Sequence, residues 1–362
     1  MPIDERTLCG RIKSWIDEEL RDKPYGNLSG ADIEAHPSGG DRRRHDILIY
    51  AGARPVFSFE VKLPTDPHGA TPYDADLVRS ARSKAEDDGL THFGTCNCAA
   101  FVLWQVDMPG VPVLDRSVGK WSVVEPRNIT RLEGTEAEED FRRFIPQLLE
   151  QVAAVAAGAS PTGSGMRQPE EELVARIESS LITIVGLTLP DVVERFRTDQ
   201  EFRADVKRWM IYEQGWQWDD SLADQLLERV TQIACYLLMN QILFHSTMRQ
   251  RFGELEEIDL SRARSGRGVK QRLAPHFRAA REVSRDYETI FDVGFITEVA
   301  YCGDAAASAW AGLVRVVQGI DLGAVTLDVL GGIFERLLSP EERHRFGQHY
   351  TVPELVDLLV GA

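Results

Sequence analysis

The chain has 362 residues, of which 43 % are apolar and 27 % are charged, a composition that excludes a disordered or fibrous protein. Its 57 acidic and 41 basic residues give a net charge of −16, which excludes a protein that coats nucleic acid without specificity. The sequence lacks a run of about 18 apolar residues, and its start MPIDERTLCG lacks the layout of a secretory signal, so we expect a cytoplasmic protein without a membrane partner.

The first part of the chain is predicted to be mixed α/β. Apolar residues recur at helical spacing from Leu8 to Leu20, which predicts an amphipathic helix over residues 4–22. After a passage rich in glycine, proline and serine, HDILIYAG and PVFSFEVKL are typical of two strands joined by a short turn over residues 52–55. A helix over about residues 74–88 then precedes two more predicted strands, HFGTCN and AAFVLWQVD.

The second part of the chain is predicted to be helical. Small residues, glycine and proline replace the apolar periodicity over residues 156–170, which predicts a linker. Leucine and aromatic residues then recur in predicted helices at 170–186, 189–196, 199–212, 220–250 and 273–290. We therefore expect a first domain over residues 1–155, a helical domain over 171–325 and a further segment over 326–362.

Two carboxylates and a lysine are predicted to converge on the hairpin of the first domain. In FSFEVKL, Glu60 and Lys62 share one face of the strand, and the phenylalanines share the other. Asp46 opens the neighbouring strand, within reach of Glu60 if the two strands pair. Two carboxylates beside a lysine can hold Mg²⁺ and orient a water for phosphodiester hydrolysis. Glu19 lies in the apolar arc of the first helix, where an acid needs a partner such as this metal site or Lys62.

These residues, in the order Glu19, Asp46 and Glu60-Val61-Lys62, with a helix and a strand pair after them, resemble the PD-(D/E)XK nuclease superfamily over residues 1–110. The resemblance implies an α/β restriction-endonuclease-like domain with an αβββαβ core, followed by an all-α domain. It also implies that Asp46 and Glu60 bind Mg²⁺ or Mn²⁺. Lys62 would position or activate a water and stabilise charge on the phosphate, and Glu19 would assist the metal or a nearby water.

A purely structural interpretation stays open for these side chains. Glu60 and Lys62 could form a solvent-facing ion pair on an edge strand, which would contribute little to stability. Glu19 could reach water at the edge of its helix. His45, which stands where the superfamily usually has a proline, is expected to be a solvated turn residue rather than a DNA contact. Lys84 lies in a region where the superfamily often places a polar residue facing the site, but we expect it to be exposed.

The end of the chain carries a second resemblance. IFERLLSPEERHRFGQHYTVPELVDLLV resembles the opening of an N6-adenine DNA methyltransferase of type I and type IIG restriction-modification systems, in which a G-x-x-Y-T-P element lines the S-adenosylmethionine pocket. Here Tyr350 and Thr351 would line that cofactor site. The Gly-rich cofactor loop and the (D/N)-P-P-(Y/F) motif do not occur in these residues, so we expect methylation only in a longer, full-length protein. The helical middle is similar to the connector of fused enzymes of this kind.

Two basic segments are candidates for DNA contact. The first consists of Arg42, Arg43 and Arg44. The second spans residues 262–285 and includes Arg264, Arg267, Lys270 and Arg272. A solvated face and a phosphate contact both fit the second segment, and its charge in so acidic a chain favours phosphate contact.

The resemblances together predict a Mg²⁺-dependent, type IIG-like site-specific deoxyribonuclease module of a restriction-modification or phage-defence protein. Its partners would be double-stranded DNA, a second copy of the chain for double-strand cleavage, and other defence-system subunits. Two alternatives stay open. One is a degenerate nuclease fold that serves as a DNA-binding scaffold for the methyltransferase. The other is a defence methyltransferase of the BREX or DISARM kind whose N-terminal part recruits partner proteins.

Overall fold

The computed structural model describes residues 3–35, 44–159, 161, 169–284, 288–291 and 294–319. By its internal contacts the chain forms two compact units. Unit 1 comprises Met1–Pro190 and Ala305–Leu313, and unit 2 comprises Asp191–Asp304 and Val314–Ala362. An α/β part is followed by a helical part, in agreement with the sequence-based prediction.

Unit 1 is built around a six-stranded sheet with the strand order β1-β2-β3-β4-β5-β6. The strands are β1 (Leu28–Ala35), β2 (His45–Ala51), β3 (Arg54–Val61), β4 (His92–Cys96), β5 (Ala100–Gln105) and β6 (Ser117–Ser122). The β3 and β4 strands are parallel, and all other neighbours are antiparallel. Because a tight turn cannot join parallel neighbours, the chain crosses from β3 to β4 through helix α2 (Ala75–Asp87).

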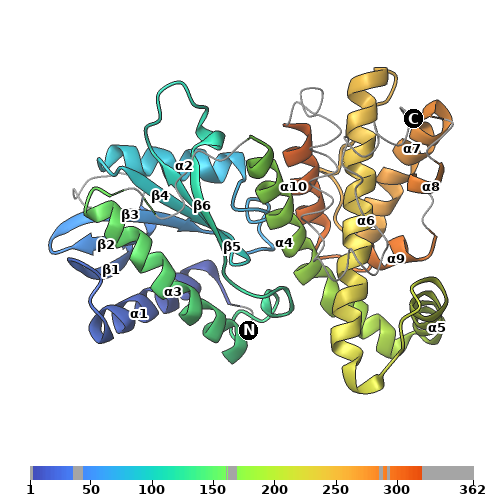
Figure 1. The fold of residues 1–362 in the computed structure, drawn as a ribbon, viewed down its shortest axis with the longest axis horizontal. Coiled ribbons are helices and arrows are strands. Elements are labelled where there is room, and N and C mark those ends of the chain that lie inside the picture. Colours follow the sequence, from blue (N-terminus) through green and yellow to red (C-terminus); the bar gives the residue numbers. More distant parts are fainter. Residues whose placement is uncertain are drawn as a thin grey trace, which may run out of the picture. The chain divides into compact units, whose positions relative to one another are not determined.

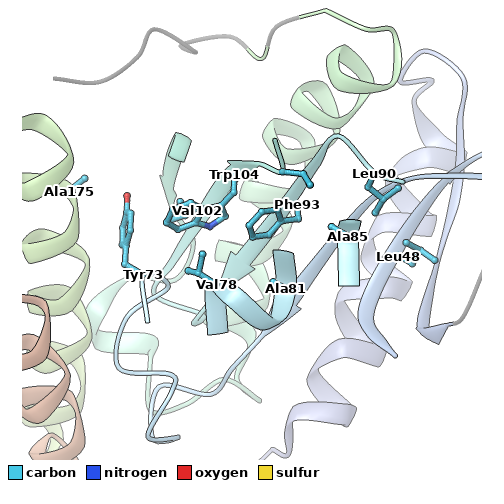
Figure 2. Packing of buried hydrophobic residues seen from close by; sticks show 11 residues of the cluster. Leu48, Tyr73, Val78, Ala81, Ala85, Leu90, Phe93, Val102, Trp104 and Ala175 are labelled. Carbon is cyan, nitrogen blue, oxygen red and sulfur yellow. The ribbon is translucent and has the colours of Figure 1, made fainter. Parts of the chain in front are cut away.

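Helices cover both faces of this sheet (Figure 1). On one face lie α1 (Glu5–Asp22) and α3 (Thr135–Ala156), where the Phe101 ring centroid is 5.5 Å from that of Phe59 and 5.3 Å from that of Phe144. The α2 helix packs on the opposite face, and Figure 2 shows the apolar cluster there, which includes Leu48, Val78, Ala81, Phe93 and Trp104. Side chains of both faces of β3 are therefore buried over the second half of the strand.

The residue patterns did not locate every element of unit 1, although the αβββαβ order implied by the resemblance includes a third strand before α2. The β1 strand lies in the passage rich in glycine, proline and serine, and its sequence LSGADIEA has few residues that favour strands. It pairs with β2 through the backbone, and the backbone N–H of Ala31 donates to Asp17 of α1 at 3.0 Å. The β6 strand and α3 also have no counterpart in the prediction. Since β3 lies inside the sheet, the edge-strand interpretation of Glu60 and Lys62 is wrong.

Helix α4 (Pro169–Thr198) is continuous where the sequence predicts two helices, and Pro190 lies inside it. Its first part belongs to unit 1, where Glu178 pairs with Lys120 of β6 and Thr183 accepts a hydrogen bond of 2.9 Å from Asn97. The contacts of the structure divide the chain at Pro190, and most of the predicted linker over 156–170 lies outside the described residues.

The segment Leu173–Thr198 of α4 is long and apolar enough to cross a membrane by length and composition alone, the one such helix among the residues the structure describes. In its most apolar window 72 % of the residues are buried inside the structure. A mostly buried apolar helix is consistent with the core helix of a soluble protein.

Unit 2 is helical over the residues that are described. Its elements after α4 are α5 (Gln200–Arg208), α6 (Ala223–Phe252), α7 (Gly266–Ser284), α8 (Glu288–Phe291), α9 (Ile296–Ala300) and the end of α10 (Ala307–Gln318). The α6 helix is the long helix predicted at 220–250, and it ends at Gly253, whose φ of 63° is left-handed and favours glycine. The α7 helix begins well before its predicted start at residue 273. The predicted methyltransferase segment over 326–362 lies outside the described residues.

Candidate active site

Asp46 and Glu60 lie side by side at one end of the β2–β3 hairpin, as the sequence predicts. The pairing of Ile47 with Phe59 places the two acids opposite each other in the next register position. The backbone N–H of Asp46 donates to Glu60 Oε1 at 3.4 Å, and the backbone N–H of Val61 donates to Asp46 Oδ2 at 2.9 Å. The Asp46 carboxylate thus replaces a backbone partner where the ladder of β3 ends.

Lys62 follows β3 and is the third member of the predicted group. Its Nζ lies 2.6 Å from Glu5 Oε1 and 4.0 Å from Asp46 Oδ2. The turn between β4 and β5 fixes its backbone, because the Lys62 N–H donates to the Cys96 carbonyl at 2.8 Å and its own carbonyl accepts from Cys98 Sγ at 3.5 Å. Cys98 has a φ of 68°, the one left-handed non-glycine backbone among the described residues, and this conformation turns the thiol toward Lys62.

The acid that α1 contributes to the site is Glu5 and not Glu19. Glu5 lies in the first turn of the helix and pairs with Lys62, whereas Glu19 accepts a hydrogen bond from the Tyr25 hydroxyl at 2.5 Å. Because a helix rises 1.5 Å per residue, the two acids are roughly 20 Å apart along α1. The partner that Glu19 needs on its buried face is therefore a tyrosine.

Lys84 of α2 is buried against Glu60, so the prediction that Lys84 is exposed is wrong. Its ammonium contacts Glu60 Oε2, and the two side chains are only 11 % and 5 % exposed. Burial and the neighbouring charge of Asp46 raise the pKa of Glu60 to about 7, although Lys84 and Lys62 oppose the shift. The Glu60 carboxyl therefore takes up a proton when the pH falls below about 7.

The charge of Lys62 is fixed by its neighbours. Burial lowers the pKa of Lys62, but the hydrogen bond to Glu5 and the charges of Asp46 and Glu60 outweigh it and raise that pKa above its ordinary value. Lys62 is therefore an ammonium ion at neutral pH. It can orient a water or stabilise an anion, but it cannot take a proton from a water.

His45 is buried beside the site, in contrast to the solvated turn residue that the sequence predicts. Its side chain is 1 % exposed, and its Nε2 lies 2.5 Å from Asp88 Oδ2 at the end of α2. Burial lowers the pKa of His45, and Asp88 opposes that shift. Among the described residues, the buried Nδ1 has no hydrogen-bond partner. The hydrogen bond between His45 and Asp88 ties β2 to α2 next to the contact between Glu60 and Lys84.

The carboxylates of Glu5, Asp46 and Glu60 offer only oxygen donors, which is the ligand set that Mg²⁺ and Mn²⁺ prefer. The raised pKa of Glu60 also fits a cation site, because two acids repel each other there and a divalent cation would stabilise both as carboxylates. Asp46 and Glu60 therefore fit the metal that the sequence suggests. A cation bound by Glu60 would compete with the Lys84 ammonium for the same oxygen.

The remaining predicted residues lie elsewhere. Arg42 and Arg43 fall outside the described residues, and Arg44 is exposed just before β2. Arg264, Arg267, Lys270 and Arg272 lie in unit 2, in the turn before α7 or on α7 itself. Tyr350 and Thr351 fall outside the described residues.

Comparison with solved structures finds similarity to the type IIG restriction endonuclease BpuSI, with a TM-score of 0.33 and 13 % sequence identity. The match covers 97 % of this chain but 32 % of that chain, so this chain corresponds to a minor part of the neighbour's length. No protein-family model matches the sequence, and no curated protein matches it.

Proposed function

We propose that unit 1 is a PD-(D/E)XK-like nuclease domain that hydrolyses DNA phosphodiester bonds with Mg²⁺ or Mn²⁺. The observation that carries the proposal is the convergence of Asp46, Glu60 and the Lys62 ammonium at one end of β3, beside the parallel β3–β4 pair. Phosphoryl transfer to water requires groups that position the reactants and stabilise the developing charge. Two carboxylates and a fixed ammonium at one point can supply both.

In this proposal each side chain has one task. Asp46 and Glu60 would hold the metal, which supplies the Lewis acid for the phosphate when it is bound. The Lys62 ammonium would orient the attacking water and stabilise negative charge on the phosphate. Glu5 would hold Lys62 in place through their hydrogen bond of 2.6 Å.

One observation favours the alternative of a degenerate domain that binds DNA as a scaffold. Glu60 already has a cationic partner in Lys84, and the pair is largely buried. A pair that never separated would leave Glu60 unable to bind a metal. The two functions therefore differ in whether the acids take up a divalent cation.

We also propose the protein to which the domain belongs, its substrate and its partners. These are a type IIG-like restriction-modification or phage-defence protein, double-stranded DNA as substrate, a second copy of the chain for double-strand cleavage, and S-adenosylmethionine only in a longer protein. If the domain is a scaffold and not a nuclease, the alternative is a BREX- or DISARM-like methyltransferase with other defence-system subunits as partners.

The test is cleavage of plasmid and phage DNA, methylated and unmethylated, with Mg²⁺ or Mn²⁺ and with EDTA. Lys62→Ala and Glu60→Gln should abolish cutting while near-UV circular dichroism stays native. Glu5→Gln should reduce cutting, and Glu19→Gln is its matched control because it lies on the same helix but away from the site. Cutting that persists in Lys62→Ala would refute the site assignment. No cutting by the wild type, with DNA binding intact and no metal uptake, would favour the scaffold.

A further inference from the structure

Unit 2 contains a hollow of about 460 Å³, within the usual range of small-molecule sites. Its walls are the first turns of α7, the α9 helix with the residue after it, and Arg195 of α4. Three of the side chains that line it are cationic, and Glu298 is the acidic one. The hollow is thus positively charged within a chain whose net charge is −16.

The cations around the hollow differ in how they are held. The Arg195 guanidinium lies over the Phe202 ring, 4.4 Å from its centroid, and hydrogen-bonds Asp199 at 3.3 Å. Lys270 Nζ lies 2.5 Å from Glu298 Oε1. Arg267 has no carboxylate within 4.0 Å in the described part of the chain. One cation of the hollow therefore lacks a counter-charge, and a second is preoriented by an aromatic ring.

Other arginines before and along α7 also lack a close carboxylate within the described ranges, although Asp259 interacts electrostatically with Arg262 and Arg272. Over the described residues, no carboxylate lies within 4.0 Å of the guanidinium of Arg262, Arg264, Arg272 or Arg278. Elsewhere paired arginines are common; Arg142, for example, contacts both Glu18 and Glu138. Unpaired cations that cluster in a chain with 57 acidic residues form a surface that attracts an anion.

Neutral groups complete the hollow. Burial raises the pKa of Tyr301, so its hydroxyl stays a hydrogen-bond donor across the physiological range. The first turn of α7 is packed against the backbone at Tyr301, because a Cβ on Gly266 would lie 1.9 Å from the Tyr301 carbonyl oxygen. Arg267, Lys270 and Gln271 lie three and four residues apart and so face the hollow together.

We propose that this hollow binds a phosphate group carried by a nucleotide unit, with Arg267, Lys270 and Arg195 as the cationic ligands and Tyr301 as a neutral donor. Guanidinium and ammonium groups are the usual partners of phosphate oxygens, and Tyr301 with Ala274 gives an apolar wall for the attached sugar or base. The phosphate belongs either to a DNA backbone or to a free nucleotide. The proposal goes beyond cleavage and does not depend on the site in unit 1.

The test uses the full chain in low salt with three probes: inorganic phosphate, ATP and a short fluorescent DNA duplex. We expect saturable binding, and a loss of about tenfold in affinity or more in Arg267→Gln and in Lys270→Gln, because each removes a charge-assisted hydrogen bond. Arg278→Gln is the matched control, since it removes an unpaired arginine of the same helix that does not line the hollow. Its affinity should change less than about twofold.

The three probes separate the two sources of phosphate. Displacement of the duplex by ATP, with both lost in Arg267→Gln, indicates the DNA backbone as a ligand of the hollow. ATP binding that is lost in Arg267→Gln, without competition by the duplex, indicates a free nucleotide. The absence of saturable binding of every probe, or equal affinities in wild type, Arg267→Gln and Lys270→Gln, would overturn the proposal. Arg267 and Lys270 lie in unit 2, so loss of ATP binding in their variants is a result separate from the cleavage test of unit 1.

Discussion

Replacing Lys84 by methionine should increase the affinity of unit 1 for a divalent metal ion. In the structure the Lys84 ammonium contacts Glu60 Oε2, and both side chains are almost buried. A metal ion that uses this oxygen must first separate the pair. Methionine keeps most of the length and the apolar stem of the lysine and removes the ammonium group, so it can pack against the same neighbours on α2.

The size of the effect follows from the contact that is lost. A hydrogen bond between charged groups contributes about 1.5–3 kcal/mol. Since about 1.4 kcal/mol corresponds to a tenfold change in affinity, metal binding should strengthen by about tenfold to a hundredfold. Without Lys84 the pKa of Glu60 rises further above 7, so the gain should emerge only at alkaline pH, where Glu60 is ionised in the variant as well.

The assay is titration with Mn²⁺, followed by water-proton relaxation, over a pH series. Thermal unfolding with and without metal gives a second readout, because a ligand that binds only the folded state raises the midpoint. Lys120→Met is the matched control: Lys120 contacts Glu178, and its side chain is also 11 % exposed, but the pair lies away from Asp46 and Glu60. Its metal affinity should equal that of the wild type.

Two results would contradict this reasoning. If Lys84→Met and the wild type bind Mn²⁺ equally well at every pH, the ammonium does not compete for Glu60. If neither binds Mn²⁺ while both remain folded, Asp46 and Glu60 do not form a metal site, and the scaffold function becomes the better interpretation. Cleavage assays alone would not distinguish these cases, because Lys84 could also affect the bound DNA.

Three further predictions concern stability and pH. The pKa of Glu60 is about 7 in the folded protein and 4.5, its ordinary value, in the unfolded chain. The folded state therefore binds more protons between these pH values, and the free energy of unfolding should fall as the pH rises from 4.5 to about 7. Glu60→Gln should flatten this slope in denaturant titrations. Gly94→Ala should lower the free energy of unfolding by about 1–3 kcal/mol, because the new Cβ would lie 2.4 Å from the Phe101 ring; an unchanged midpoint in urea would contradict this. Trp104→Phe should cost about 1–3 kcal/mol, since it leaves Thr95 without its 2.8 Å hydrogen bond from the indole, and calorimetry would measure the loss.

The central pair of the site was predictable because it depends on local rules. Strand alternation places Glu60 and Lys62 on one face, and the short turn sets the register that brings Asp46 opposite Glu60. These rules need no knowledge of the rest of the fold. The pairing of β2 with β3 and the contacts of both acids confirm this part of the prediction.

The other members of the site depend on how distant elements pack, and the sequence does not specify that. Periodicity places Glu19 in the apolar arc of α1, where the structure leaves it half-buried. It cannot distinguish which end of α1 lies near Lys62, and that end carries Glu5. Lys84 and Asp88 are polar residues on a helix that could as well be exposed. Their buried partners lie 24 and 43 residues away in sequence, on β3 and β2.

The position of Asp46 has a consequence for how this domain can change during evolution. Its carboxylate accepts the backbone N–H of Val61 at 2.9 Å, so the side chain completes the end of β3 as well as facing the site. Loss of catalysis through Asp46→Asn would keep an acceptor for that N–H, whereas Asp46→Ala would leave a backbone donor without a partner. We therefore expect lineages that abandon catalysis to drift toward asparagine or serine at this position, so that inactive descendants retain a recognisable remnant of the ancestral residue.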